Sequence, residues 1–91
     1  MAHYVYILRC NDGTLYTGYS TDPKRRLREH QQGKGARYTR GRRPVELLGF
    51  IQYKTRSEAQ AAEAAIKLYS PAKKIKILME KGDPNVRKDC R

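Results

Sequence analysis

Five side chains of the types used in phosphoryl-transfer chemistry occur in order along this chain. They are Tyr6, Tyr16, Arg26, His30 and Glu63. A phenol near a cation or metal ion can orient or deprotonate a water, and an arginine can clamp a phosphate. A histidine can pass a proton near neutral pH, and one carboxylate, with water and phosphate oxygens, is the usual protein contribution to a magnesium site. Together these groups could cleave a phosphodiester bond.

Each of these residues also has a purely structural explanation. The two tyrosines could be strand aromatics that pack on a core, and Arg26 could be a solvated charge of a basic helix. His30 could be a packing histidine near a helix end, and Glu63 could form an ion pair with the lysine four residues later. The positions of the secondary-structure elements must therefore decide whether the five side chains meet.

A β-hairpin is expected to carry both tyrosines. Residues 3–10 and 14–20 are rich in aromatic and β-branched types, which favours strands, and the turn residues 11–13 end in Gly13. A three-residue loop with Gly13 in the left-handed region pairs Cys10 with Thr14. In that register Tyr6 lies opposite Gly18 and Leu8 opposite Tyr16, so both tyrosines share one face. A two-residue turn would put them on opposite faces, and we expect the three-residue loop.

Arg26 and His30 are expected on the first helix. Asp22 as N-cap and Pro23 at the first helical position predict its start, and Gly33 predicts its end after about residue 32. Arg26 and His30 are four residues apart and therefore point the same way. They flank Leu27, the only large apolar residue of this helix, so they should lean toward the sheet while the other charges face water.

The second half of the chain predicts one strand and two helices. Residues 33–44 are expected to form a mobile basic loop, and residues 45–53 the most apolar strand, at the centre of the sheet. A capping box at Ser57 predicts a helix over 58–69, with Glu63 at the edge of its inward face. Ser70 and Pro71 predict a last helix to about residue 81, closed by Gly82. The expected inward stripe of that helix is Ile75, Leu78 and Met79.

This order, β-β-α-β-α-α, predicts an α+β fold with a small three-stranded antiparallel sheet flanked by helices. We expect a single domain over residues 1–82 and a polar tail over 83–91. The two cysteines, Cys10 and Cys90, are not expected to form a disulfide. No apolar run is long enough to span a bilayer, and the N-terminus does not resemble a signal peptide. The sequence therefore predicts a reduced cytoplasmic protein.

The charge of the chain predicts a polyanionic partner. Its 20 Lys and Arg outnumber its 9 Asp and Glu, for a formal net charge of +11. Nine of these cations lie between residues 24 and 43, a footprint suited to phosphates and not to base sequence. Tyr38 in this stretch could stack on an unpaired base or be a plain loop aromatic. The candidate nucleic-acid-binding residues are Lys24, Arg25, Lys34, Arg37, Tyr38, Arg40, Arg42, Arg43 and Lys67.

The motifs in this order resemble those of the GIY-YIG endonuclease family. The resemblance begins at Tyr4-Val5-Tyr6 and Tyr16-Thr17-Gly18 and continues through residues 22–30 and 33–39. It ends with Glu63-x-x-x-Lys67, so that it covers residues 3 to about 80. The chain looks most similar to small stand-alone members that consist of this domain alone. Tyr4 and Thr17 depart from the glycine and isoleucine of the family motifs, at positions outside the catalytic set.

The resemblance implies DNA cleavage dependent on Mg²⁺ or Mn²⁺. One of the two tyrosines would act as general base, Arg26 would bind the phosphate, His30 would assist, and Glu63 would bind the metal. Without an accessory domain we expect low sequence specificity and a preference for branched or damaged DNA, as in repair or recombination. No small-molecule cofactor and no membrane partner are expected. Two alternatives stay open: a non-catalytic DNA- or RNA-binding protein on the same scaffold, and a basic module that docks an acidic protein.

Overall fold

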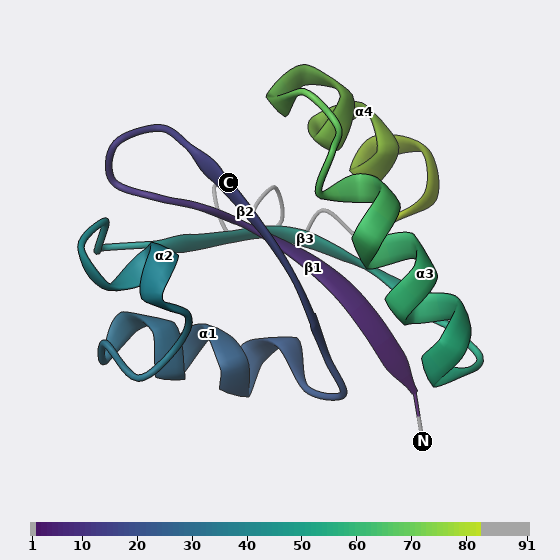
Figure 1. The fold of residues 1–91 in the computed structure, drawn as a ribbon, viewed down its shortest axis with the longest axis horizontal. Helices are drawn as coiled ribbons and strands as arrows, with labels where there is room; N and C mark the ends of the chain where they lie inside the picture. Colours follow the sequence, from purple (N-terminus) through teal and green to yellow (C-terminus); the bar gives the residue numbers. More distant parts are fainter. Residues whose placement is uncertain (1, 83–91) are drawn as a thin grey trace.

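The computed structural model describes residues 2–82 and has the expected α+β fold (Figure 1). Its strands and helices follow in this order: β1 His3–Arg9, β2 Leu15–Ser20, α1 Pro23–Gln31, α2 Arg37–Arg40, β3 Glu46–Tyr53, α3 Arg56–Ile66 and α4 Pro71–Lys81. The three-stranded antiparallel sheet flanked by helices is confirmed. The predicted tail 83–91, with Cys90, lies outside the described residues. None of the helices in the described part is long and apolar enough to cross a membrane.

The order of the strands is β2-β1-β3, so β1 is central and β3 is an edge strand. The prediction that residues 45–53 form the central strand was therefore wrong. Val5, Tyr6, Ile7 and Leu8 are all at most 1% exposed, which means that β1 is covered on both faces. Its tyrosines and its histidine lower its average hydrophobicity below that of β3, and this concealed its central position.

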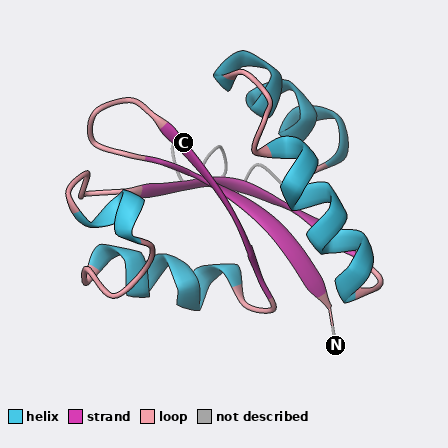
Figure 2. Cartoon of the chain, viewed as in Figure 1, coloured by secondary structure: helices cyan, strands magenta, loops and turns pink. Residues whose placement is uncertain are grey.

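The register of the β1–β2 hairpin is the predicted one. The Cys10 amide donates to the Thr14 carbonyl at 2.8 Å, and Gly13 has a φ of 85°. Tyr6 pairs with Gly18 and Leu8 with Tyr16. The loop that joins the two strands is visible in Figure 2. Both tyrosines therefore face the same side of the sheet.

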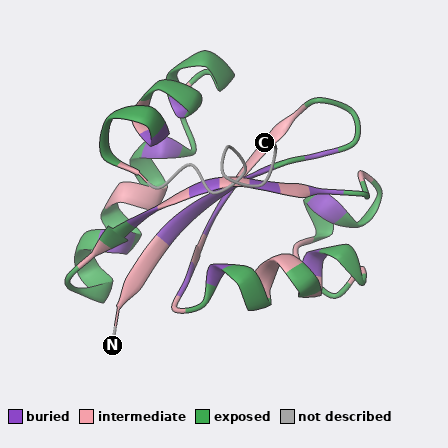
Figure 3. Cartoon of the chain, turned by 180° about the vertical axis from the view of Figure 1, so that it is seen from behind, coloured by how far each residue is buried: buried purple, intermediate pink, exposed green. Residues whose placement is uncertain are grey.

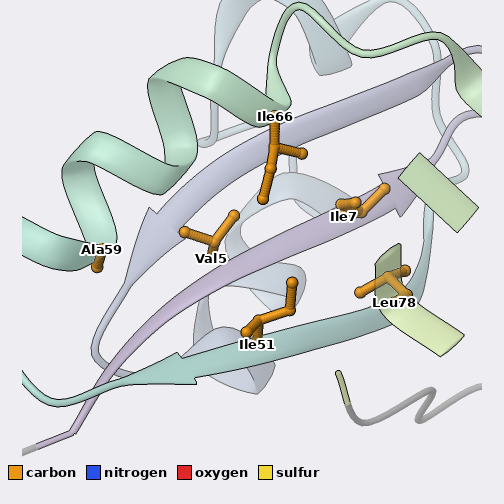
Figure 4. Close-up of a cluster of buried hydrophobic side chains, with 6 residues drawn as sticks. All are labelled: Val5, Ile7, Ile51, Ala59, Ile66 and Leu78. Atoms are coloured by element: carbon orange, nitrogen blue, oxygen red, sulfur yellow. The ribbon is translucent and has the colours of Figure 1, made fainter. Parts of the chain in front are cut away.

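Helices cover both faces of the sheet. On one face α3 and α4 pack over a buried cluster of Val5, Ile7, Ile51, Ala59, Ile66 and Leu78 (Figure 4). On the other face α1 covers a second cluster of Tyr6, Leu8, Cys10, Val45 and Leu47. Figure 3 shows that the buried residues concentrate along the sheet while the helices expose their outer faces. The candidate site residues on α1 and β1 therefore lie on the face of the sheet that α1 covers.

Residues 33–44 are not a featureless loop, because they contain the short helix α2. Gly33, with a φ of 80°, ends α1 as expected. The turn at Gly41 follows α2, and the Asn11 amide then donates to the Arg42 carbonyl at 2.8 Å. This hydrogen bond ties the segment to the β1–β2 turn. Runs of glycine and arginine conceal such an element, because its stability comes from contacts with the rest of the fold and not from its own helix propensity.

The last two helices differ from the prediction in detail. Helix α3 begins at Arg56, because Thr55 and not Ser57 is its N-cap and accepts from the Glu58 amide at 3.1 Å. It ends at Ile66, and residues to Tyr69 continue as a tighter turn with i to i−3 hydrogen bonds. In α4, Leu78 is buried as predicted.

The predicted inward stripe of α4 was otherwise wrong. Ile75 and Met79 are 44% and 55% exposed, whereas Lys74 is 7% exposed. Ile77, partly buried, packs against the cluster that contains Leu78. Helix α4 is rotated so that Lys74 and Leu78, four residues apart, face inward. A lysine can take such a position because its aliphatic stem packs against apolar surface, and an apolar count alone does not reveal this.

Candidate active site

Helix α1 directs Arg26 and His30 toward the sheet. The Asp22 carboxylate caps the helix by accepting from the Arg25 amide at 3.2 Å. His30 is fully buried and the Arg26 side chain is 31% exposed, whereas Lys24 and Arg25 are exposed. The predicted helical phase is therefore the observed one.

A buried chain of hydrogen bonds connects β1, α1 and α2. The Tyr6 hydroxyl lies 3.0 Å from His30 Nε2. On the other side of the ring, His30 Nδ1 lies 2.7 Å from Thr39 Oγ1. Thr39 is fully buried, and its hydroxyl donates to the Ala36 carbonyl at 2.9 Å. Sequence reasoning missed Thr39, whose only signal was its place at the end of the motif over residues 33–39.

Two glycines allow this close approach. A Cβ on Gly18 would overlap the Tyr6 hydroxyl, and a Cβ on Gly35 would overlap the His30 ring at Nδ1. Gly18 therefore marks a close contact, with the Tyr6 ring on the adjacent strand. Any larger residue at either position would displace the hydrogen-bonded pair.

Tyr16 completes an aromatic cluster around His30. Its ring centroid lies 5.4 Å from that of His30 and 6.4 Å from that of Tyr6. Tyr38 stacks on Tyr16 at 5.9 Å and is 38% exposed, at the rim of the cluster. Tyr6 is 1% exposed, whereas Tyr16 is only partly buried. The two predicted tyrosines are thus brought together, with Tyr16 nearer to solvent.

Burial keeps both members of the Tyr6–His30 pair neutral at neutral pH. Desolvation, followed by the Arg26 charge, lowers the pKa of His30 to about 4. Desolvation, followed by repulsion from Tyr16, raises the pKa of Tyr6, although the Arg26 guanidinium acts in the opposite direction. A phenolate at Tyr6 therefore requires more positive charge than the protein itself supplies.

Arg26 lies between this pair and an acidic neighbour. Its Nη1 donates to Glu29 Oε1 at 2.6 Å, and this contact holds the pKa of Glu29 below its usual range. Both side chains are about one-third exposed. A partly solvated ion pair contributes little to stability. Arg26 can therefore exchange Glu29 for a phosphate at small cost.

Glu63 approaches from the opposite layer, on α3. Its carboxylate is 21% exposed and forms the expected ion pair with Lys67 at 3.4 Å. Its charge raises the pKa of Tyr6, but it is the smallest of the five effects on that group. Of the five candidate residues, Glu63 is therefore coupled to the others only by charge.

The basic residues of the predicted footprint divide into two groups. Arg42 is fixed internally: it pairs with Asp12 at 3.0 Å, donates to the Tyr38 carbonyl at 2.8 Å and covers the Tyr38 ring at 4.0 Å. Arg43 donates to the carbonyls of Arg40 and Gln31. Arg43 is nevertheless exposed. The other predicted cations, Lys24, Arg25, Lys34, Arg37, Arg40 and Lys67, are exposed too, and of these the described residues give only Lys67 a side-chain partner, Glu63.

Comparison with known proteins identifies the family. The family model of the GIY-YIG catalytic domain matches residues 2–76. The chain belongs to the GIY-YIG family. A UPF0213 protein of Haloquadratum walsbyi is 53% identical over 83 residues, which cover 91% of this chain and 93% of that protein. A UPF0213 protein of Staphylococcus epidermidis is 51% identical over 78 residues, covering 86% and 95%.

Solved structures support the same assignment. The solution NMR structure of a UPF0213 protein from Bacillus halodurans is 47% identical and has a TM-score of 0.56, covering 93% of this chain and 90% of that one. The solution NMR structure of a protein from E. faecalis is 45% identical, with a TM-score of 0.60, covering 88% of this chain and 85% of that one. GIY-YIG proteins form a family of the nuclease type that acts on nucleic acid and generally uses divalent metals.

The residues of this GIY-YIG domain fit a magnesium site built on one carboxylate. Residues 2–82 contain no group of three or more His, Cys, Asp or Glu side chains that could hold a metal. Mg²⁺ does not need such a cage, because it keeps several waters and binds one or two carboxylates plus phosphate oxygens. Glu63 is 21% exposed, and among the described residues its ion-pair partner is the half-exposed Lys67, so its oxygens are available for this role.

Proposed function

We propose that this protein is a divalent-metal-dependent DNA endonuclease of low sequence specificity that favours branched or damaged DNA, as in repair or recombination. One observation carries the proposal: side chains from three elements, β2, α1 and α3, gather around Tyr6 of β1. His30 is hydrogen-bonded to it, and Tyr16 contacts its ring. Arg26 and Glu63 act on its pKa with opposite charges. A phenol, an imidazole and a guanidinium beside one another, with a carboxylate near enough to act on the pKa of the phenol, form a set suited to phosphodiester hydrolysis.

Each side chain has a defined task in this reaction. Arg26 releases Glu29 and clamps the scissile phosphate, whose negative charge grows in the transition state. A tyrosine orients the attacking water and accepts its proton. His30 assists through its hydrogen bond with the Tyr6 hydroxyl. Glu63 holds the divalent cation, which when bound supplies Lewis-acid stabilisation of the phosphoryl charge. The pKa of Tyr6, raised by burial, means that the phenol acts within a hydrogen-bonded network and not as a free phenolate.

The DNA is held through its backbone. The exposed cations on α1 and around α2 form a surface suited to phosphates, and the chain carries a formal net charge of +11. Phosphate contacts position a protein without reading bases. Low sequence specificity follows from this surface.

A non-catalytic nucleic-acid-binding protein is the second candidate. Arg26 pairs with Glu29 on its own helix at 2.6 Å, and Glu63 pairs with Lys67, the residue just after the end of α3, at 3.4 Å. Such pairs give both residues a structural role without any reaction. The exposed cations serve a binder equally well, so that Glu63 is the residue that separates the two candidates.

The deciding experiment compares Glu63→Gln with Glu58→Gln. Glu58 is exposed in the first turn of the same helix, which makes it a matched control. Duplex, nicked, flapped and single-stranded DNAs are incubated with each protein in Mg²⁺, Mn²⁺ or chelator, and binding is measured separately. We expect metal-dependent cleavage by the wild type and Glu58→Gln, and binding without cleavage by Glu63→Gln. DNA binding by the wild type without any cleavage would favour the second candidate.

A further inference from the structure

Thr39 determines which nitrogen of His30 carries the proton. Its hydroxyl has two short contacts, 2.9 Å to the Ala36 carbonyl and 2.7 Å to His30 Nδ1. A carbonyl oxygen only accepts, and a hydroxyl has a single hydrogen. When both contacts are hydrogen bonds, Thr39 donates to Ala36 and its lone pair faces His30. Nδ1 must then be the donor to Thr39.

The hydrogen on Nδ1 also determines the state of the other ring nitrogen, Nε2. A neutral imidazole has one N–H, and burial keeps His30 neutral by lowering its pKa to about 4. With the hydrogen on Nδ1, the lone pair is on Nε2, 3.0 Å from the Tyr6 hydroxyl. Tyr6 is therefore the donor in the Tyr6–His30 hydrogen bond. We infer that Thr39 is a positioning residue that holds His30 as the Nδ1–H tautomer, with Nε2 ready to accept the proton of Tyr6.

The surrounding chain builds this arrangement into the fold. The Gly33 amide donates to the His30 carbonyl at 3.1 Å, and the Lys34 amide donates to the Glu29 carbonyl at 2.9 Å. Gly35 then passes so close to His30 that no side chain would fit. The segment is thereby fastened to the end of α1, and α2 presents the Thr39 hydroxyl to the ring at a fixed position.

The catalytic consequence rests on the proposed function. As the attacking water gives a proton to the Tyr6 oxygen, the original Tyr6 proton moves to His30 Nε2. The resulting hydroxide forms a bond to phosphorus while the bond from phosphorus to the leaving sugar oxygen breaks, and that oxygen takes a proton from solvent water. Tyr6 stays neutral, in agreement with its raised pKa, and His30 becomes an imidazolium that still donates to Thr39. The phosphates of bound DNA favour this cation. In the opposite tautomer Nε2 would carry the hydrogen and could accept nothing from Tyr6.

The tautomer can be measured without any substrate. Long-range ¹H–¹⁵N correlation spectra of the imidazole distinguish Nδ1–H from Nε2–H. We expect the Nδ1–H form in the wild type at neutral pH and in Thr39→Ser, which keeps the hydroxyl. Thr39→Val has nearly the same shape without the hydroxyl, and we expect it to populate the Nε2–H form. A wild-type protein with the hydrogen on Nε2 would overturn the inference, even when Thr39→Val does not fold. A folded Thr39→Val protein with the same tautomer as the wild type would also overturn it.

Cleavage assays test the catalytic consequence separately. We expect Thr39→Ser to cleave at nearly the wild-type rate and Thr39→Val to lose about 100-fold or more, the lower end of what a positioned acid–base group contributes. Full activity in a Thr39→Val protein whose tautomer has changed would overturn the positioning role. A wild type that cleaves no DNA under any condition would instead refute the proposed function, and the spectra would still decide the tautomer.

Discussion

Tyr6→Phe isolates the buried hydrogen bond at the centre of the site. The substitution removes one oxygen atom and keeps the ring that packs between Gly18 and the buried face of α1. His30 Nε2, 3.0 Å away and fully buried, then has no partner. The main effect should come from that unsatisfied nitrogen, because a phenylalanine ring fills nearly the same space.

The expected magnitude follows from the cost of leaving a buried polar group unpaired. That cost is about 1–3 kcal/mol. In a domain of this size, 1 kcal/mol corresponds to about 4–8 °C in melting temperature. Tyr6→Phe should therefore melt about 4 °C or more below the wild type, and by the proposed function it should cleave little or no DNA.

Thermal unfolding followed by circular dichroism measures the effect, and Tyr4→Phe is the matched control. Tyr4 is on the same strand and packs edge-on against Phe50 at 5.3 Å. The described residues provide no hydrogen-bond partner for its hydroxyl, so Tyr4→Phe should change the melting temperature very little. Equal melting temperatures for wild type and Tyr6→Phe would show that the Tyr6–His30 hydrogen bond does not stabilise the protein.

Three further predictions concern charge. Arg26→Ala should reduce cleavage far more than Arg25→Ala, because only Arg26 leans toward Tyr6; equal small losses in cleavage assays would contradict this. Replacing the exposed Lys34, Arg37 and Arg40 with Ser should flatten the salt dependence of DNA affinity, measured by titration at several salt concentrations. The ratio of the affinities for two unrelated DNA sequences should stay the same. Because the folded pKa of His30, about 4, lies below its ordinary 6.5, the unfolded chain binds more protons between these values. Stability should therefore fall as pH decreases from about 6.5, and urea unfolding at neutral pH and at about pH 5 checks this.

The hairpin and the first helix were predictable because local chemistry determines them. A three-residue turn ending in glycine permits one register, and that register places Tyr6 and Tyr16 on one face. Asp22 and Pro23 define where α1 begins, so the helical phase of Arg26 and His30 follows. The positions of these residues could be predicted without knowing any contact between distant parts of the chain.

The central position of β1 and the role of residues 33–44 were not predictable from local pattern. Helix α2 has only four residues and exists through its contacts with α1 and the β1–β2 turn. Arg42 and Arg43 look like loop cations in the sequence, yet in the fold they hold this segment in place. Counting charge cannot separate a cation that fastens a loop from one that is free for a phosphate.

This distinction determines which substitutions can test DNA binding. The Asp12–Arg42 ion pair connects the hairpin turn to the segment that carries Thr39, and Arg42 also covers the Tyr38 ring, which stacks on Tyr16. Removing Arg42 would therefore disturb the site itself along with any phosphate contact. Lys34, Arg37 and Arg40 are exposed in the same segment and lack that connection to Asp12. A loss of affinity after their replacement can be assigned to the phosphate contacts, because the buried Tyr6–His30–Thr39 chain is left intact.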